Sequence, residues 1–314
     1  MNSDKIINYS LRPSKSIERK MMLEVFKEVC TPSNSDNYQY IGFGASFFQD
    51  FKIIHRELNI STMISIEGHD TDLNIKRCQF NKPFNCIKII PGKSYEKLPK
   101  LNWEKNSIVW LDYDRCLQNY MFQDAETCCQ KAKSGGFLVL SLRREFDQKN
   151  KEEFEEEFGE KVPVSIKAED IEPLKSHLTI REMFINKINE TLLNEYSHEK
   201  EEDRLIFKQL FNFNYKDGAP MYTFGGMFIY KKEEEMFNKY KFNSYHFISP
   251  NETSTNISFP IITNKEYHEL TRHLPNDKDE FLKNEEIDFI PLKHKRSYFS
   301  VYRQYPTYIE VNDI

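Results

Sequence analysis

The sequence predicts an α/β fold whose doubly wound sheet of seven strands ends in an antiparallel hairpin. Three observations predict it. Short apolar runs alternate with helix-like segments from Tyr38 onward, a glycine turn follows the first of these runs, and a hairpin signal, Asp217-Gly218, lies late in the chain. Strands that alternate with helical crossovers form a mostly parallel sheet with helices on both faces.

The composition is that of a folded protein. Hydrophobic residues make up 39% of the 314 residues, and 25 Phe with 17 Tyr supply large rings for a core. The length exceeds the usual single domain of about 100 to 200 residues, which indicates one large domain with an appendage, or two domains. A net charge of −5 gives no global positive field for nucleic acid or an anionic membrane, so a nucleic-acid partner is possible but not favoured.

The N-terminal sequence and the cysteines indicate the compartment. The chain begins without the apolar core of a signal peptide and has no run of about 18 apolar residues that could span a bilayer. We therefore expect a cytoplasmic protein without membrane contact. The 6 cysteines form no CxxC pair and have no histidine at zinc spacing, which predicts no metal site. Adjacent Cys128 and Cys129 are interpreted as small apolar helix residues.

Apolar periodicity predicts the order of the elements in the first half of the chain. An amphipathic helix is expected over Ser16–Cys30, followed by a polar loop. Five strands are then expected, at Tyr38–Gly42, Thr62–Glu67, Cys86–Ile90, Ser107–Tyr113 and Gly136–Leu142. Crossover helices are expected at Ser46–Leu58, Asp70–Cys78 and Asp114–Lys133.

The second half begins with strongly charged runs, interpreted as solvated helix faces of an insertion over about residues 145–204. Leu205–Phe213 and Met221–Tyr230 are the predicted hairpin strands. We divide the chain into an N-terminal helical segment (1–35), a nucleotide-binding domain that contains the insertion (36–235) and a C-terminal α+β extension (236–314). In the extension a helix is expected near Asn264–Leu274, and a half-buried strand is expected in the final aromatic segment.

A glycine turn, Gly42-Phe43-Gly44, lies between the first strand and the first crossover helix. Glycines at such a turn allow the backbone to approach a ligand, and the helix that follows offers unpaired N–H groups. A tight strand-to-helix turn without a ligand would need the same two glycines, so both interpretations stay open on this segment alone.

Carboxylates end the second and fourth strands. Glu67 follows Gly44 by 23 residues, close to the spacing of about 20 that places an acid on a ribose in dinucleotide-binding folds. The alternative for Glu67 is a solvated strand end. Asp112 and Asp114 end the fourth strand, and carboxyl ends of parallel strands face the ligand crevice. We predict Asp112 for the site as a base or an orienting group, and Asp114 either for the site or as the cap of the next helix.

In the order of these parts, residues about 36–230 resemble the class I S-adenosylmethionine (SAM)-dependent methyltransferases, which have a Rossmann-like fold. IGFGA is similar to their glycine motif, LDYD occupies the position of their fourth-strand motif, and SGGFLVLSLR resembles their fifth strand. The late hairpin resembles the antiparallel strands that distinguish them from dehydrogenases. The amino-acid sequence is also similar to bacterial sequences named as "putative O-methyltransferases". The resemblance implies SAM as cofactor, bound by Gly42, Phe43, Gly44, Glu67 and Asp112, with Asp112 and Asp114 as catalytic residues.

The sequence departs from that family pattern in three places. The glycine motif is short, and Lys93 and Ser94 stand where many relatives carry an acidic or polar residue that reads adenine. Asp112-Tyr113-Asp114 is not the NPPY or DPPY tetrapeptide of the enzymes that methylate amino groups of DNA bases. These departures put the adenine contacts and the target atom in doubt and disfavour N-methylation of DNA.

Two flanking segments and one histidine complete the candidates. A basic N-terminal stretch could bind an anion, although a solvated helix start is favoured; it contains Arg12, Lys15, Arg19 and Lys20. A C-terminal stretch could stack on bases, although a half-buried strand is favoured; it contains Lys293, Lys295, Arg296, Arg303, Tyr298, Tyr302, Tyr305 and Tyr308. His69 could act in proton transfer.

The leading hypothesis is a SAM-dependent methyltransferase that transfers a methyl group to an oxygen, or to another nucleophile, of an unidentified substrate. The alternative is a catalytically inactive module of the same fold that recognises a protein or RNA partner in a bacterial multi-component system. A nicotinamide-dependent dehydrogenase would also fit the Gly and Glu spacing, but the hairpin argues against it. The oligomeric state does not follow from the sequence.

Overall fold

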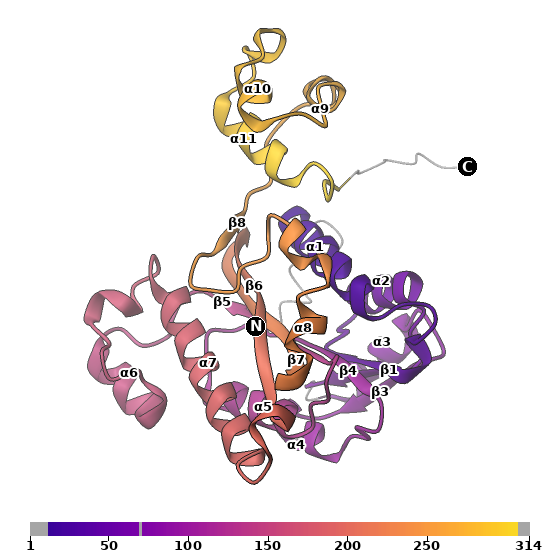
Figure 1. The fold of residues 1–314 in the computed structure, drawn as a ribbon, viewed down its shortest axis with the longest axis vertical. Coiled ribbons are helices and arrows are strands. Elements are labelled where there is room, and N and C mark those ends of the chain that lie inside the picture. The colour runs from indigo at the N-terminus through magenta and orange to yellow at the C-terminus, as the bar shows by residue number, and fades with distance from the viewer. Residues whose placement is uncertain (1–11, 69–70, 307–314) are drawn as a thin grey trace.

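The centre of the protein is an eight-stranded sheet, seen in a computed structural model that describes residues 12–68 and 71–306 (Figure 1). The strand order is β3-β2-β1-β4-β5-β7-β6-β8. Strands β1 to β5 are parallel, and β7 pairs antiparallel with both β5 and β6. The predicted doubly wound α/β fold with an antiparallel final hairpin is confirmed. A short strand that no sequence pattern indicated, β8, adds to the outer edge parallel to β6.

The bounds of the elements follow the predicted order. The strands are β1 Tyr38–Gly42, β2 Met63–Glu67, β3 Ile87–Pro91, β4 Asn106–Asp112, β5 Phe137–Arg143, β6 Leu205–Asp217, β7 Ala219–Tyr230 and β8 Thr255–Ile257. The helices are α1 Pro13–Val29, α2 Gln49–Leu58, α3 Asp72–Asn81, α4 Ser94–Lys97, α5 Asn119–Gln130, α6 Lys151–Phe158, α7 Ser176–Glu195, α8 Glu234–Phe237, α9 Asn264–Arg272, α10 Lys278–Lys283 and α11 Leu292–Val301. The hairpin turn is tighter than expected, because only Gly218, with φ +110°, separates β6 from β7.

Two crossover helices begin later than the sequence predicts. Helix α2 begins at Gln49 because Phe48 before it takes a left-handed backbone, with φ 50°. Helix α5 begins only at Asn119, since the chain after β4 first runs beside β5, where the Arg143 N–H donates to the Arg115 carbonyl at 2.9 Å. The prediction that Asp114 caps this helix is therefore wrong.

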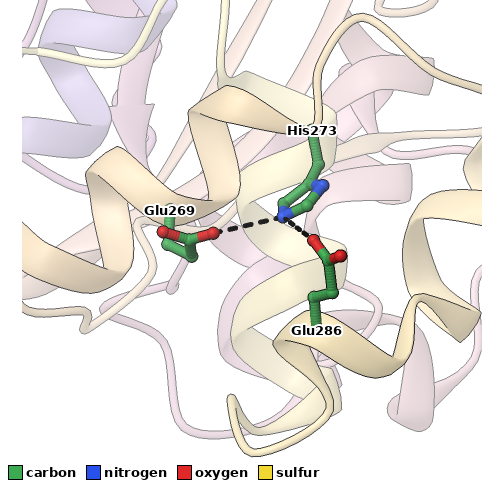
Figure 2. A group of neighbouring side chains, drawn as sticks. All are labelled: Glu269, His273 and Glu286. Atoms are coloured by element: carbon green, nitrogen blue, oxygen red, sulfur yellow. Dashed lines mark hydrogen bonds and ion pairs between the residues drawn. The ribbon is translucent and has the colours of Figure 1, made fainter.

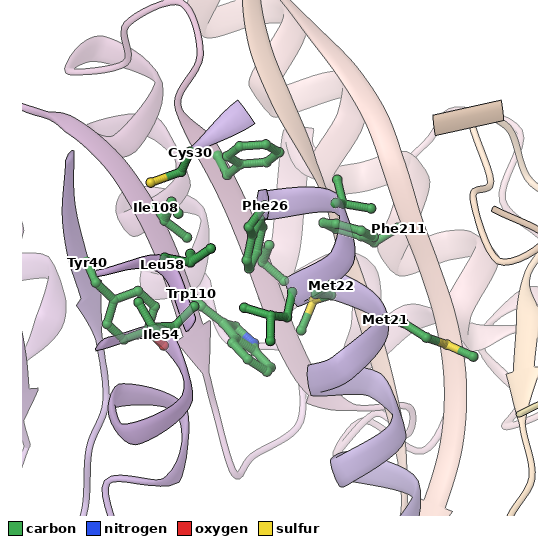
Figure 3. Close-up of a cluster of buried hydrophobic side chains, with 14 of the residues drawn as sticks. Met21, Met22, Phe26, Cys30, Tyr40, Ile54, Leu58, Ile108, Trp110 and Phe211 are labelled. Atoms are coloured by element: carbon green, nitrogen blue, oxygen red, sulfur yellow. The ribbon is translucent and has the colours of Figure 1, made fainter. Parts of the chain in front are cut away.

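One face of the sheet is covered by α1 and α2 (Figure 3). Met21, Met22 and Phe26 of α1 point to the strands, and the Phe26 ring packs edge-on against that of Phe137 in β5 at 4.9 Å between centroids. Ile54 of α2 faces the same core. Strand side chains alternate between the two faces, as a pleated strand requires. The amphipathic pattern of the N-terminal helix is thus explained by packing against the sheet.

The opposite face is covered by α5 and α7. Phe122 of α5 packs against Phe184 of α7 with centroids 4.9 Å apart, and Phe184 stacks on Phe224 of β7. Cys128 and Cys129 are buried in this layer as the expected small apolar helix residues. In the insertion, α6 buries only its two phenylalanines and exposes its glutamates, which confirms the solvated face predicted there.

The C-terminal helices α9, α10 and α11 lie together at one end of the molecule, apart from the sheet (Figure 1). They enclose a small core of their own, formed by Leu270, Phe281, Ile287, Ile290 and Tyr298. The prediction of a half-buried strand in the final aromatic segment is wrong, because Leu292–Val301 is helical. Tyr298 lies in this helix and is buried, whereas Tyr302 and Tyr305 follow its end. Tyr308 lies outside the described residues.

The described part of the chain holds no helix that is both long and apolar enough to cross a membrane.

Candidate functional site

A cavity of about 420 Å³ lies at the carboxyl ends of β1, β2, β3 and β4. Residues at the end of each strand, or directly after it, line the cavity, and side chains of α1 and α2 close one side. The residues that line the cavity include Arg19, Phe43, Gly44, Asp50, Glu67, Gly68, Ser94, Tyr95, Asp112, Tyr113, Asp114 and Tyr120. Parallel strands end at one edge of the sheet, which is why segments so far apart in the sequence meet here.

The glycine turn is needed for packing within the fold, and one of its glycines also lines the cavity. A Cβ on Gly44 would lie 2.3 Å from the ring of Phe48 and 2.7 Å from the hydroxyl of Ser65. A Cβ on Gly42 would lie 2.9 Å from the Trp110 carbonyl of the neighbouring strand. Gly44 borders the cavity, whereas Gly42 is not among the residues that line it. The residues of the turn with a left-handed backbone are Ala45 and Phe48, so the two glycines are required for space and not for a positive φ.

Glu67, at the end of β2, fixes this turn from the cavity wall. Its Oε1 accepts hydrogen bonds from the backbone N–H groups of Gly44 at 3.1 Å and Ala45 at 3.0 Å, and from the Ser65 hydroxyl at 2.6 Å. Its Oε2 accepts a weak hydrogen bond from the Cys78 thiol at 3.8 Å. Glu67 is 3% exposed, so the interpretation as a solvated strand end is wrong.

Asp112 and Asp114 both border the cavity at the end of β4, as expected from the strand topology. Asp112 forms an ion pair with Lys15 of α1, with 2.9 Å between Oδ1 and Nζ. Lys15 is fully buried, and Arg19 is only 6% exposed. The prediction that this basic stretch is a solvated helix start is therefore wrong for both residues.

Arg19 brings a second ion pair to the cavity wall, because its guanidinium donates to the carboxylate of Asp50 in α2. Both side chains border the cavity and both are buried. Burial lowers the pKa of Arg19, but Asp50 more than offsets this effect, so the net shift is upward. Sequence analysis included Arg19 among its basic residues but missed Asp50, whose role depends on how α1 lies across α2.

Aromatic rings form the far wall of the cavity. Tyr113 lies between Phe43 and Tyr120, with ring centroids 5.3 and 5.9 Å away, and Tyr95 lies 5.8 Å from Tyr120. No spacing in the sequence indicated this wall, since its members come from four different segments.

Asp124 of α5 supports the aromatic wall from behind. Its Oδ2 accepts hydrogen bonds from the hydroxyls of Ser94 at 2.5 Å and Tyr113 at 2.7 Å. Burial raises the pKa of Asp124 to about 6, although both hydrogen bonds act in the opposite direction. Sequence analysis missed Asp124, which resembles any other polar residue of an amphipathic helix.

The remaining candidates lie away from the cavity or outside the described residues. His69 belongs to the latter. Lys20 donates to the Tyr305 carbonyl at 3.2 Å and so joins α1 to the end of the chain. The C-terminal basic and aromatic residues up to Tyr305 belong to α11 and the segment after it, on the small helical core.

A histidine and two glutamates meet in the C-terminal helices (Figure 2). The ligand atoms of Glu269, His273 and Glu286 lie within 4.8 Å of one another. The side-chain nitrogen of Asn284 lies 3.0 Å from His273 Nδ1, and the two carboxylates face the other ring nitrogen, Nε2. That nitrogen lies 3.3 Å from Glu269 and 3.5 Å from Glu286, which describes a hydrogen-bonded link between α9 and the turn after α10.

Comparison with known proteins gives one family and several structures. Residues 7–313 match the family described as "Putative O-methyltransferase". Among solved structures, the chain is similar to the spermidine synthase of Thermotoga maritima, with a TM-score of 0.39 and 14% identity over 77% of this chain and 68% of that chain. It is also similar to an rRNA methylase of Streptococcus thermophilus, with a TM-score of 0.34 and 8% identity over 66% of this chain and 93% of that chain. A "putative O-methyltransferase" of Klebsiella pneumoniae has a TM-score of 0.34 and 9% identity over 71% of this chain and 84% of that chain. No curated protein matches the chain.

Proposed function

We propose a function from one premise: the chain belongs to the family described as "Putative O-methyltransferase". The proposal is that the cavity binds SAM and that the protein transfers its methyl group to an oxygen of a substrate. The observation that carries it is the convergence of the glycine turn, two strand-end carboxylates and an aromatic wall on one cavity. Its volume of about 420 Å³ lies within the range of about 300 to 1,000 Å³ typical of sites for small ligands.

The cofactor's ribose would lie against Glu67 and the glycine turn. A buried carboxylate at the end of β2 borders the cavity and can accept from hydroxyl groups. The same side chain holds the N–H groups of Gly44 and Ala45, so it also sets the shape of the turn. This double duty supports a site that is formed before the ligand arrives.

The adenine would lie against the aromatic wall. The flat adenine base can stack on the ring faces of Tyr113 and Tyr120, because stacking requires only a π-surface. Asp124 fixes Tyr113 and Ser94 from behind. In this proposal, stacking on the aromatic wall takes the place of the acidic residue that many relatives carry after the third strand.

The methionine end of the cofactor carries both an ammonium and a carboxylate group. Arg19 and Asp50 present one cation and one anion side by side on the cavity wall, and an amino-acid zwitterion complements such a pair. This match supports SAM as the ligand of the cavity.

SAM supplies a methyl group already activated by its sulfonium, so the chain's own task is to bind, orient and exclude water. We assign to Asp112 and Asp114 the orientation of the acceptor hydroxyl at the end of β4. A carboxylate there can accept a hydrogen bond from the hydroxyl group of the acceptor and so direct a lone pair of the hydroxyl oxygen into the cavity. The acceptor, a cytoplasmic location in a bacterium and any contact with nucleic acid stay predictions.

Calorimetric titration of the full chain with SAM and S-adenosylhomocysteine tests the proposal. We expect one ligand per chain and at least a tenfold loss of affinity in Asp50→Asn. Glu57→Gln is the matched control, because the exposed Lys27–Glu57 pair also joins α1 to α2, away from the cavity. No binding at millimolar ligand would refute the cofactor assignment. Binding without methyl transfer to any cellular fraction would favour the inactive binding module.

A further inference from the structure

Lys15 is a fully buried cation whose ammonium group faces the carboxylate at the end of β4. Its Nζ lies 2.9 Å from Asp112, 2.7 Å from Glu18 and 3.0 Å from the Tyr215 hydroxyl, and it lies over the Trp110 ring at 4.6 Å from the centroid. Lysines are almost never buried completely unless they are paired. The described partners occupy the directions in which the ammonium group can donate.

The backbone of Lys15 is fixed as firmly as its side chain. The Asp217 carboxylate, at the end of β6, accepts hydrogen bonds from the N–H groups of Ser14 at 3.1 Å and Lys15 at 2.8 Å. These are first-turn N–H groups of α1, which have no partner within a helix. A side chain from the hairpin thus caps α1 and sets the position from which Lys15 reaches β4.

The two carboxylates that share Lys15 have different surroundings. The side chain of Glu18 is 0% exposed and accepts from the Thr223 hydroxyl, whereas that of Asp112 is 13% exposed and borders the cavity. Burial raises the pKa of Glu18 despite the nearby Lys15. Burial lowers the pKa of Lys15, but Asp112 and Glu18 raise it more, so the lysine stays charged. Of the two carboxylates that pair with Lys15, Asp112 is the one that borders the cavity.

From this geometry we propose that Lys15 is a positioning residue that holds the Asp112 carboxylate in place at the cavity wall, so that α1 is part of the site. The inference rests on the proposed function, which gives Asp112 a ligand to orient. A merely structural role explains the arrangement poorly. Buried ion pairs add little net stability compared with apolar residues of similar size. Four partners around one buried lysine beside the cavity are better explained by the need to hold Asp112.

The test is S-adenosylhomocysteine binding by the full chain, measured at a temperature where every variant is folded. We expect Asp112→Asn and Lys15→Met each to lower the affinity about tenfold or more, and the double variant to bind no more weakly than either single variant. Glu18→Gln removes the other carboxylate of Lys15 and leaves Asp112 paired, so it is expected to lower the melting temperature without changing the affinity. Lys27→Met, on the exposed side of α1, should change neither.

A second variant covers the case in which Lys15→Met fails to fold. Asp217→Ala removes the cap at the half-exposed end of β6, so we expect a folded protein in which Lys15 is displaced and the affinity falls several-fold. Unchanged affinity in Asp217→Ala and in any folded Lys15→Met protein would overturn the inference, as would equal losses in Glu18→Gln and Lys15→Met. A wild-type chain that binds no ligand would instead refute the proposed function.

Discussion

Lys15, Glu18 and Asp112 meet inside the protein, whereas Glu269, His273 and Glu286 meet near its surface. The side chains of the first group are 0%, 0% and 13% exposed, and those of the second are 31%, 16% and 75% exposed. Both groups contain one basic side chain between two carboxylates. Water can solvate the members of the second group when one is removed, but it cannot reach Lys15 or Glu18.

Burial, more than the identity of the groups, decides how much a charge contact contributes to stability. The buried group joins α1 to strands of the central sheet beside the cavity. The half-exposed group joins two neighbouring segments of the small C-terminal core. Substitutions in the buried group should therefore cost more than substitutions in the half-exposed group.

Removing the buried cation should have the largest effect. Lys15→Met leaves the Glu18 carboxylate without its cation in a region closed to water and also removes the partner of Asp112, so we expect the free energy of unfolding to fall by about 3 to 5 kcal/mol. Urea unfolding at neutral pH measures it. Lys27→Met on the same helix removes an exposed pair and should cost no more than about 1 kcal/mol. Equal losses in the two variants would show that burial does not set the scale.

The buried carboxylate behind the aromatic wall should make stability depend on pH. The pKa of Asp124 is about 6 in the fold against 3.8 ordinarily, so the folded state holds this proton more tightly than the unfolded state. Its contribution is present in full below pH 3.8 and is lost as pH rises through about 6, a change on the order of 3 kcal/mol. Asp124→Asn should therefore gain stability relative to wild type between pH 4 and pH 7. A constant difference across this range, in unfolding curves, would contradict the cause given.

The glycine turn offers a matched pair of substitutions. Gly44→Ala places a methyl group 2.3 Å from the Phe48 ring and should cost about 1 to 3 kcal/mol through overpacking. Gly68→Ala borders the same cavity, but its Cβ would meet only the Gly92 carbonyl at 4.0 Å, so stability should change little. Thermal unfolding of both variants decides the matter. A larger loss in Gly68→Ala would mean that space does not explain why position 44 is glycine.

The half-exposed C-terminal group should be the most tolerant. Glu286→Gln removes a carboxylate that is 75% exposed and should change the free energy of unfolding by less than about 1 kcal/mol. Glu285→Gln, in the same turn, is the control for a glutamate that has no contact with His273 among those described. A loss comparable to that of Lys15→Met would remove the distinction between the two groups.

Local patterns predicted most of the fold. The strands and the hairpin are recognisable because their signals are local: short apolar runs that alternate with helix-like segments, and an Asp-Gly turn. The final aromatic segment is the exception, because its aromatic content favours a strand whereas Leu292–Val301 forms α11 and packs in the small C-terminal core. Aromatic content is a weak guide there, because its preference depends on what the rings pack against.

The cavity was predictable only where it follows strand ends. Gly44, Glu67, Asp112 and Asp114 were placed there by their spacing along the chain, and all four border the cavity. Asp50 and Asp124 gave no signal, because their partners are brought to them by helix packing across long sequence distances. Lys15 was recognised as basic, but its burial depends on the position of α1 over the sheet.

A crystal structure of the full chain grown with S-adenosylhomocysteine would test the cofactor assignment. We expect the ligand in the cavity at the ends of β1 to β4, with its adenine on the Tyr113 and Tyr120 side and its amino-acid end beside Arg19 and Asp50. A ligand bound anywhere else on the chain, or an empty cavity at millimolar ligand, would contradict it.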